Sequence, residues 1–357
     1  MMWNPTAKLF LRAGLAACLL HCAESVELPV RMQYPTEISE ILLTGVTDGE
    51  VEFRPKGRDT GGRAYIEIET LIDQGVTFAF MFPAEFYEAV GQLKRGSLER
   101  ALPIIRREAR PFLDIMELSV LPGNHLPAVY AYMDALQATK NWAEAVEVAL
   151  KFPLASAPPG ALQRVGRLAL KLKEAGQADR LRQLHAHIEA PADYSLQHLE
   201  QLMDLANQWR ESGAYTYAYK LYLKVQMREG PLQTRARLWV GYCSFYLDDA
   251  TVSERFLSNL PEVEFETPDY SLRELIQARL RMREEEYDRA MRNAAAGKTY
   301  ASPTDSWYPE LLFLLANLYA DFEMEAAAEA THRELSILFP SSQWAQQSLQ
   351  ILENEPQ

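Results

Sequence analysis

The side chains that could do chemistry are few, and their spacing does not assemble a catalytic or metal site. The six histidines do not occur at a metal-ligand spacing such as H-E-x-x-H. His185 and His187 are two residues apart, so on a helix they point to different faces. Cys243 follows Gly241 and Tyr242 with no neighbouring base to activate its thiol. The sequence therefore predicts no enzyme, no metal site and no cofactor.

One local cluster of basic residues has the composition of an anion site. Arg54, Lys56, Arg58 and Arg63 surround three glycines in a single stretch. Guanidinium groups and the backbone N–H groups of glycine-rich loops can hold phosphate or carboxylate groups. The stretch lacks the spacing of a phosphate-binding P-loop and opens no helix, so it does not indicate a nucleotide site. It predicts either a solvated hairpin loop or a site for an anionic polymer.

The overall charge opposes anionic partners. The 357 residues carry a formal net charge of -13, and 48% of them are hydrophobic. A chain of this length can bury a large core without a metal or a disulfide. An acidic surface repels nucleic acid and anionic membranes unless a basic patch overrides it. No nucleic-acid partner is expected.

The first 25 residues predict a signal peptide. Lys8 and Arg12 precede the short apolar run Ala13–Cys22, and small residues stand before Val26, where we expect cleavage. The run is too short to span a bilayer as a permanent helix. A second interpretation is a lipoprotein signal, because the four residues ending at Cys18 resemble a lipobox and would place a lipid there. We expect export to the periplasm or cell envelope, with membrane contact only through such a lipid anchor.

Residues 26–82 predict a small antiparallel β domain. Asp48-Gly49 separates two strand-like runs, which is the spacing of a two-residue hairpin. Ile66 and Ile68 alternate with polar residues and predict a further strand, and the last one runs from Val76 to Phe80. The strand–turn–strand order resembles the Sm-like small barrels. A small barrel or sheet of about four or five strands is therefore expected.

Residues 83–357 change to helical spacing, and the clearest unit is Leu199–Pro231, in which two amphipathic stretches meet at Gly213. A small residue of the first stretch recurs at intervals of 35, 37 and 38 residues: Ala206, Gly241, Ala278 and Ala316. This pattern resembles the tetratricopeptide repeat (TPR) family, in which a helix pair of about 34 residues repeats. The resemblance implies a mainly α fold, with a TPR-like α-solenoid of about six to seven helix pairs after the β domain. A C-terminal helix would cap the solenoid.

The resemblance also implies where a partner binds. In this family the first helix of each pair lines a concave groove, and the matching residues of this chain are Asn207, Arg210, Tyr242, Phe245, Arg279 and Asn317. The lysines that hold a C-terminal carboxylate in some members are replaced by Met203 and Phe313. We therefore expect a non-enzymatic exported TPR scaffold that binds a protein or an extended peptide. The alternative is a module for an anionic polymer (glycan, lipid head group or RNA) that uses residues 54–63, with the repeats serving assembly.

Overall fold

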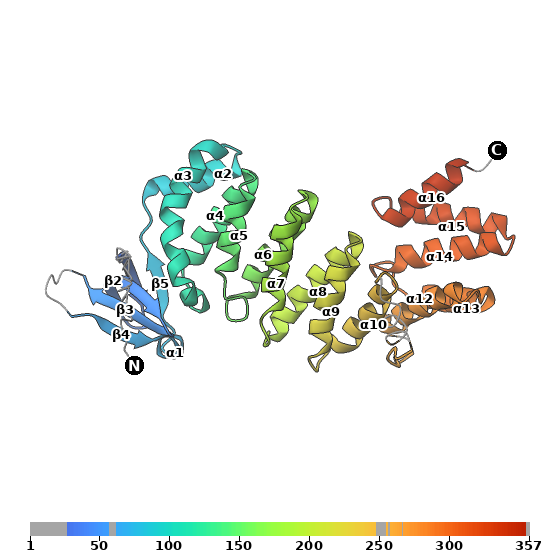
Figure 1. The fold of residues 1–357 in the computed structure, drawn as a ribbon, viewed down its shortest axis with the longest axis horizontal. Coiled ribbons are helices and arrows are strands. Elements are labelled where there is room, and N and C mark those ends of the chain that lie inside the picture. Colours follow the sequence, from blue (N-terminus) through green and yellow to red (C-terminus); the bar gives the residue numbers. More distant parts are fainter. Residues whose placement is uncertain (1–26, 57–61, 248–254, 256–257, 266, 355–357) are drawn as a thin grey trace, which may run out of the picture. The chain divides into compact units, whose positions relative to one another are not determined.

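The computed structural model describes residues 27–56, 62–247, 255, 258–265 and 267–354 (Figure 1). The predicted signal peptide with Cys18, and Arg58 of the basic loop, lie outside the described residues. The chain divides into two compact units, the first ending at Tyr132 and the second beginning at Met133. In the part of the chain that the structure describes, no helix combines the length and the apolar character needed to cross a bilayer.

The first unit begins with a five-stranded antiparallel sheet, as predicted. Its strands are β1 (Leu28–Gln33), β2 (Ile38–Thr47), β3 (Glu50–Pro55), β4 (Ala64–Glu67) and β5 (Thr77–Phe80). Their order across the sheet is β4-β3-β2-β1-β5. No pairing joins β4 to β5 among the described residues, so these strands form an open sheet and not a closed barrel.

The β2–β3 hairpin forms where the sequence predicts it. Asp48 and Gly49 both have positive φ, 55° and 81°. A two-residue turn of this kind matches the right-handed twist of the strands, and Asp-Gly tolerates it well. One face of the hairpin is buried through Ile41, Leu43 and Val51, each at most 4% exposed.

One predicted strand residue belongs to a helix instead. Strand β4 ends at Glu67, and Ile68 begins the short helix α1 (Ile68–Asp73). Ile68 and Leu71 are both buried, which is the spacing of one helix face. The alternation of Ile66 and Ile68 therefore predicted a strand that is too long, because the strand ends one residue before Ile68.

The first compact unit is longer than the predicted β domain. The prediction ends that domain at residue 82, whereas the unit continues to Tyr132. Helices α2 (Ala84–Lys94) and α3 (Leu98–Ala109) are followed by the 3₁₀ segment η1 (Arg110–Val120), which packs against β2. The backbone N–H of Phe78 donates to the carbonyl of Pro122 at 2.9 Å. The Asn124 side chain bonds both the N–H and the carbonyl of Phe80 at 2.8 Å. These bonds satisfy backbone groups at the edge of β5, so the segment after α3 completes the sheet.

The second unit consists of stacked helix pairs (Figure 1). Helix α4 (His125–Ala138) contains the boundary between the units. The helices that follow are α5 (Trp142–Leu150), α6 (Pro159–Glu174), α7 (Ala178–Glu189), α8 (Leu196–Glu211), α9 (Tyr215–Gln226), α10 (Gln233–Ser244), α12 (Pro268–Arg283), α13 (Tyr287–Tyr300), α14 (Tyr308–Asp321), α15 (Glu325–Leu338) and α16 (Gln343–Asn354). First helices also contact each other, α6 with α8 and α10 with α12. The expected TPR-like solenoid is confirmed.

The same turn closes the described helix pairs. Each pair turns at a residue with left-handed φ: Gly96, Lys140, Gly176, Gly213, Glu285 and Glu323. The residue after it donates its N–H to the carbonyl five positions earlier, as Ala214 does to Trp209. This pattern is a Schellman cap, which ends a helix and satisfies its last carbonyls. It recurs 36 residues after Lys140, 37 after Gly176 and 38 after Glu285, which makes these pairs copies of one structural unit.

The small residues of the repeat pattern lie where helices approach closely. Ala206, Ala278 and Ala316 are fully buried. A Cβ atom at Gly241 would lie 2.6 Å from Leu260 Cδ2, and one at Gly166 would lie 2.9 Å from Leu205 Cδ2. The absence of a side chain at these positions lets neighbouring elements pack tightly.

The turns generate a stability prediction. Glu285 and Glu323 occupy a backbone conformation that costs non-glycine residues roughly 1 kcal/mol. Glu285→Gly and Glu323→Gly should each raise the free energy of unfolding, by about 0.5 kcal/mol after the added unfolded-state entropy of glycine. Gly213→Ala should lower it by about 1 kcal/mol. Thermal melts of the three variants check this, and a lower melting temperature for Glu285→Gly or Glu323→Gly would contradict the assignment.

Candidate functional site

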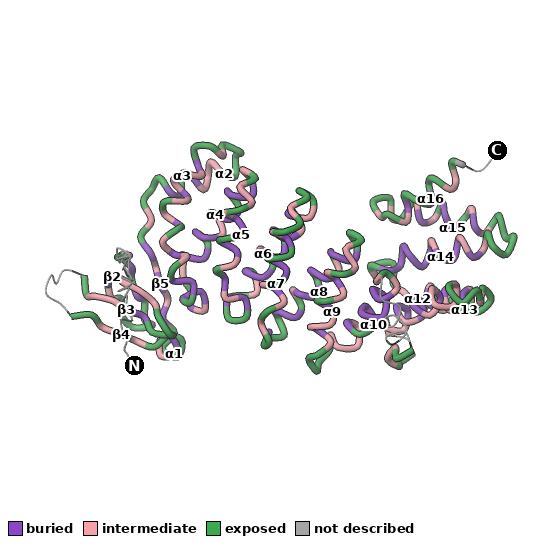
Figure 2. The backbone as a smooth tube through the Cα atoms, in the orientation of Figure 1, coloured by how far each residue is buried: buried purple, intermediate pink, exposed green. Residues whose placement is uncertain are grey.

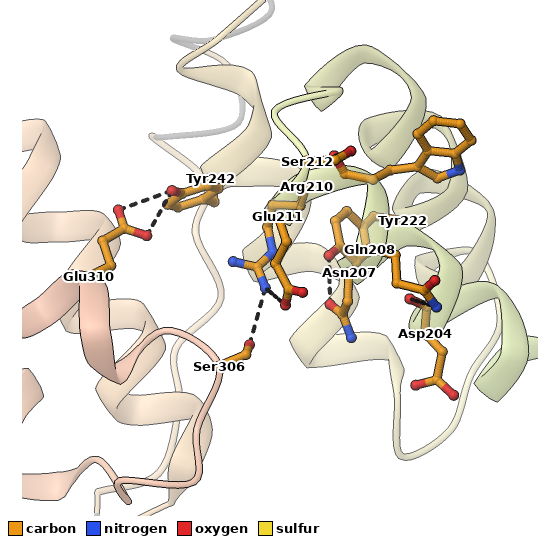
Figure 3. Close-up of polar contacts among 11 residues, drawn as sticks. Asp204, Asn207, Gln208, Arg210, Glu211, Ser212, Tyr222, Tyr242, Ser306 and Glu310 are labelled. Atoms are coloured by element: carbon orange, nitrogen blue, oxygen red, sulfur yellow. Dashed lines mark hydrogen bonds and ion pairs between the residues drawn. The ribbon is translucent and has the colours of Figure 1, made fainter. Parts of the chain in front are cut away.

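A polar network connects three first helices inside the second unit. Glu310, in the first turn of α14, is 1% exposed. Its carboxylate accepts hydrogen bonds from the Tyr242 hydroxyl of α10, at 3.0 and 2.8 Å, as Figure 3 shows. The Arg279 guanidinium of α12 donates to the same carboxylate. A buried carboxylate is costly unless it is paired, and these two donors compensate Glu310. We call Tyr242, Arg279 and Glu310 the Glu310 network.

The ionisation states suit this network. Burial and the nearby Glu310 carboxylate raise the pKa of Tyr242 well above its usual value, so the hydroxyl keeps its proton and donates. Burial alone would lower the pKa of Arg279, but the attraction of Glu310 outweighs it and the pKa is raised. The Glu310 carboxylate therefore faces a neutral hydroxyl donor and a guanidinium cation.

A buried cation, Arg210, lies beside the network. Arg210 of α8 is 5% exposed, and its guanidinium stacks 3.7 Å from the centroid of the Trp239 ring. It also donates to the Ser306 hydroxyl at 3.1 Å (Figure 3). Burial opposes the charge of Arg210, yet nearby Tyr222 and Tyr242 raise its pKa. This stacking replaces part of the hydration that the guanidinium loses.

The structure places the six predicted groove residues at different depths. Arg210 and Tyr242 are interior residues, because Trp239 and Glu310 from other repeats cover them. Arg279 keeps 23% of its side chain exposed. The remaining three are half-buried: Asn207, Phe245 and Asn317. Only these last four present surface to a partner, and their role in binding stays a prediction.

An open groove of about 310 Å³ lies between α6 and α8, beside Asn207. It is lined by Gln163, Gly166, Arg167, Gln201, Asp204, Leu205, Asn207 and Gln208. The Tyr222 hydroxyl donates to Asn207 Oδ1 at 2.7 Å, which fixes the orientation of the amide. Figure 3 shows Asn207 Nδ2 directed away from Tyr222, where it can donate to a ligand. We call this feature the α6–α8 groove.

Most groove residues were missed by the sequence analysis. The helix pair of α6 and α7 matches the repeat pattern weakly, so no inward-facing positions were assigned to it. On α8 the family pattern assigns only Asn207 of the five lining residues to the inner face. One signal was present: Gly166 stands inside a helix, where glycine is unfavourable unless close packing requires it. The structure shows that packing, since the Leu205 side chain of α8 lies against Gly166.

The basic loop carries compensated charges where it is described. Lys56 pairs with Glu40 at 3.0 Å and Arg63 with Glu52 at 2.6 Å. Arg54 forms an ion pair with Glu27. These acidic partners reduce the local positive potential, so the described residues offer no observation in favour of anion binding.

Cys243 and two of the described histidines, His185 and His198, are packed residues. Burial raises the pKa of Cys243 to about 12, so its thiol stays protonated and unreactive. His185 is 1% exposed and bonds Glu189 within α7. His198 is 5% exposed and bonds the carbonyl of Ala157 at 2.8 Å. Among the described residues, no group of three or more His, Cys, Asp or Glu is arranged to hold a metal ion.

The Glu310 network generates a prediction. Glu310→Ala leaves the Arg279 guanidinium and the Tyr242 hydroxyl without their partner, which should lower the free energy of unfolding by about 3 kcal/mol. Glu310→Gln keeps an acceptor for Tyr242 and should cost less. Chemical denaturation followed by circular dichroism measures both. An unfolding midpoint unchanged in Glu310→Ala would show that the network does not hold the repeats together.

No protein-family model and no curated protein matches this sequence. Three solved structures resemble the chain: a tetratricopeptide repeat protein from Parabacteroides merdae, PilF from Pseudomonas aeruginosa, and the C-terminal part of a TPR repeat-containing protein from Cytophaga hutchinsonii. Identities are 16%, 16% and 13%, and TM-scores are 0.40, 0.33 and 0.37. The matches cover 75%, 75% and 74% of this chain, and 97%, 96% and 99% of the others. On the repeated helix pairs and turns described above, the chain has a TPR-like helical-repeat fold.

Proposed function

We propose that the protein is a non-enzymatic scaffold that binds an extended peptide segment of a partner protein. The observation that carries this proposal is the α6–α8 groove, with Asn207 held in one orientation by Tyr222. The groove lies between two first helices of neighbouring repeats, which contact each other directly.

The chemistry of the groove favours a peptide main chain. A carboxamide carries both a donor and an acceptor, so it pairs with the N–H and C=O groups of an extended backbone. Gln163, Gln201, Asn207 and Gln208 supply four such groups around the groove. Arg167 and Asp204 add one charge of each sign, so the lining residues carry no net charge. We infer that main-chain contacts dominate and that the partner's side chains matter less.

A peptide selection tests the proposal. Peptides selected from a random displayed library on the purified chain should bind the groove. Gln163→Ala/Gln201→Ala removes two amides, and Asn207→Asp keeps the acceptor for Tyr222 while removing the donor. Each change should weaken binding about tenfold, because one or two hydrogen bonds are lost. Fluorescence anisotropy measures the dissociation constants.

The matched control removes two amides from other surfaces. Gln183→Ala/Gln347→Ala changes exposed glutamines on α7 and α16 and should leave every dissociation constant unchanged. Groove binders should also tolerate alanine at most peptide positions. Selected peptides that bind all variants equally would refute the α6–α8 groove as the binding site.

We further propose that the protein works outside the cytoplasm, in the periplasm or cell envelope. The support is the basic and apolar pattern of the first 25 residues. The intact mass of the native protein should correspond to a chain that begins at Val26. A lipidated chain that begins at Cys18 would replace soluble export by membrane tethering, and an unprocessed chain would contradict export.

A further inference from the structure

The turns of the last two helix pairs form an open hollow that lies apart from the α6–α8 groove. Two neighbouring hollows of about 540 and 480 Å³ share Asp288, Arg292 and Phe322. The turn before α13 and the start of α13 supply one side, and the turn between α14 and α15 supplies the other. Figure 2 shows both turns as exposed. We call the combined feature the turn hollow.

Three large apolar side chains are exposed at the turn hollow. Tyr287 is 43% exposed, Phe322 is 38% exposed and Met324 is 49% exposed. The turns at residues 139–141, 174–177 and 211–214 carry no exposed large apolar side chain. Exposed apolar residues that gather around a hollow mark an interaction surface more strongly than scattered ones.

The charges at the turn hollow are mostly acidic and uncompensated. Five exposed carboxylates on these turns form no ion pair with any described residue. Glu285 and Asp288 line the hollow, and three more neighbour Phe322 and Met324 in the sequence: Asp321, Glu323 and Glu325. The neighbouring Glu284 and Glu286 are already paired with Arg281 and Arg289. Only two cations nearby, Arg283 and Arg292, also lack an ion pair with described residues, so the net charge of the unpaired groups is negative. Exposed apolar side chains beside unpaired carboxylates complement a ligand that has an apolar anchor between basic side chains.

We propose that the turn hollow binds a basic amphipathic segment of a partner protein. An apolar side chain of that segment contacts Phe322 and Met324, while its lysines or arginines pair with Asp288 and the neighbouring glutamates. The unpaired carboxylates repel anionic membranes and nucleic acids, which leaves a protein segment as the occupant. The site is independent of the α6–α8 groove, so a scaffold can engage a second segment there.

The test uses two labelled 18-residue amphipathic peptides, one of leucine and lysine and one of leucine and glutamate, with the full chain at 0.15 M salt. Fluorescence anisotropy should show much tighter binding of the lysine peptide than of the glutamate peptide, because main-chain contacts at the α6–α8 groove would be common to both. Glu285→Gln/Asp288→Asn/Glu323→Gln and Phe322→Ala/Met324→Ala should each weaken binding of the lysine peptide about tenfold. Arg292→Ala should leave the affinity unchanged or raise it, because it removes a repelling charge.

Matched controls separate the site from the general acidity of the chain. Glu147→Gln/Glu174→Gln/Glu200→Gln neutralises three exposed carboxylates that form no ion pair with described residues, and Ile337→Ala/Leu349→Ala removes exposed apolar side chains elsewhere. Both controls, and Asn207→Asp in the groove, should change the affinity less than twofold. Equal weakening by a control, or no binding of the lysine peptide, would overturn the proposal. Preferred binding of the glutamate peptide with a loss in Arg292→Ala would also overturn it.

Discussion

The second unit depends on one constraint: no helix pair can bury its apolar face alone, so each must stack on its neighbours. Small buried residues such as Ala206 and Ala278 allow the close approach, and Trp209 and Trp239 fill the space around it. Stacking also buries polar side chains on the inner faces. Glu310 is retained there because Arg279 and Tyr242, from two other helices, satisfy it. We infer that the network also favours one arrangement of these three helices over others.

Local signals explain which parts of the fold could be predicted from sequence. The Asp48-Gly49 hairpin follows from backbone preferences of two adjacent residues, and the helix pairs follow from spacing that repeats along the chain. Ile68 shows the limit of such signals. An apolar residue two positions after Ile66 fits a strand, yet the same residue with Leu71 fits a helix face. The bond from the Ile68 N–H to the Gly49 carbonyl, a contact distant in sequence, accompanies the change.

The site was harder to predict. Periodicity shows which face of a helix a residue lies on, but it does not show how deeply other repeats bury that residue. Tyr242 was placed correctly on a first helix, but Glu310 lies 68 residues later and covers its hydroxyl. The covering residue belongs to another repeat, so no pattern within one unit reveals it. The α6–α8 groove was hard to predict for a different reason. Three of its lining residues belong to α6, whose repeat signal is weak, and of the five on α8 the family pattern marks only Asn207 as inward-facing. Leu205 packs against Gly166 where the two helices meet.

The two proposed surfaces differ in the property that each would recognise. The α6–α8 groove presents amides with no net charge, which suits main-chain hydrogen bonds and tolerates many sequences. The turn hollow presents carboxylates beside apolar side chains, which favours positively charged segments over negatively charged ones. The range of this attraction is the Debye length, which shortens as the salt concentration rises. Both surfaces belong to the second unit. If a partner carries both kinds of segment, binding of the first segment makes binding of the second an intramolecular step. Two weak contacts would then give a high overall affinity.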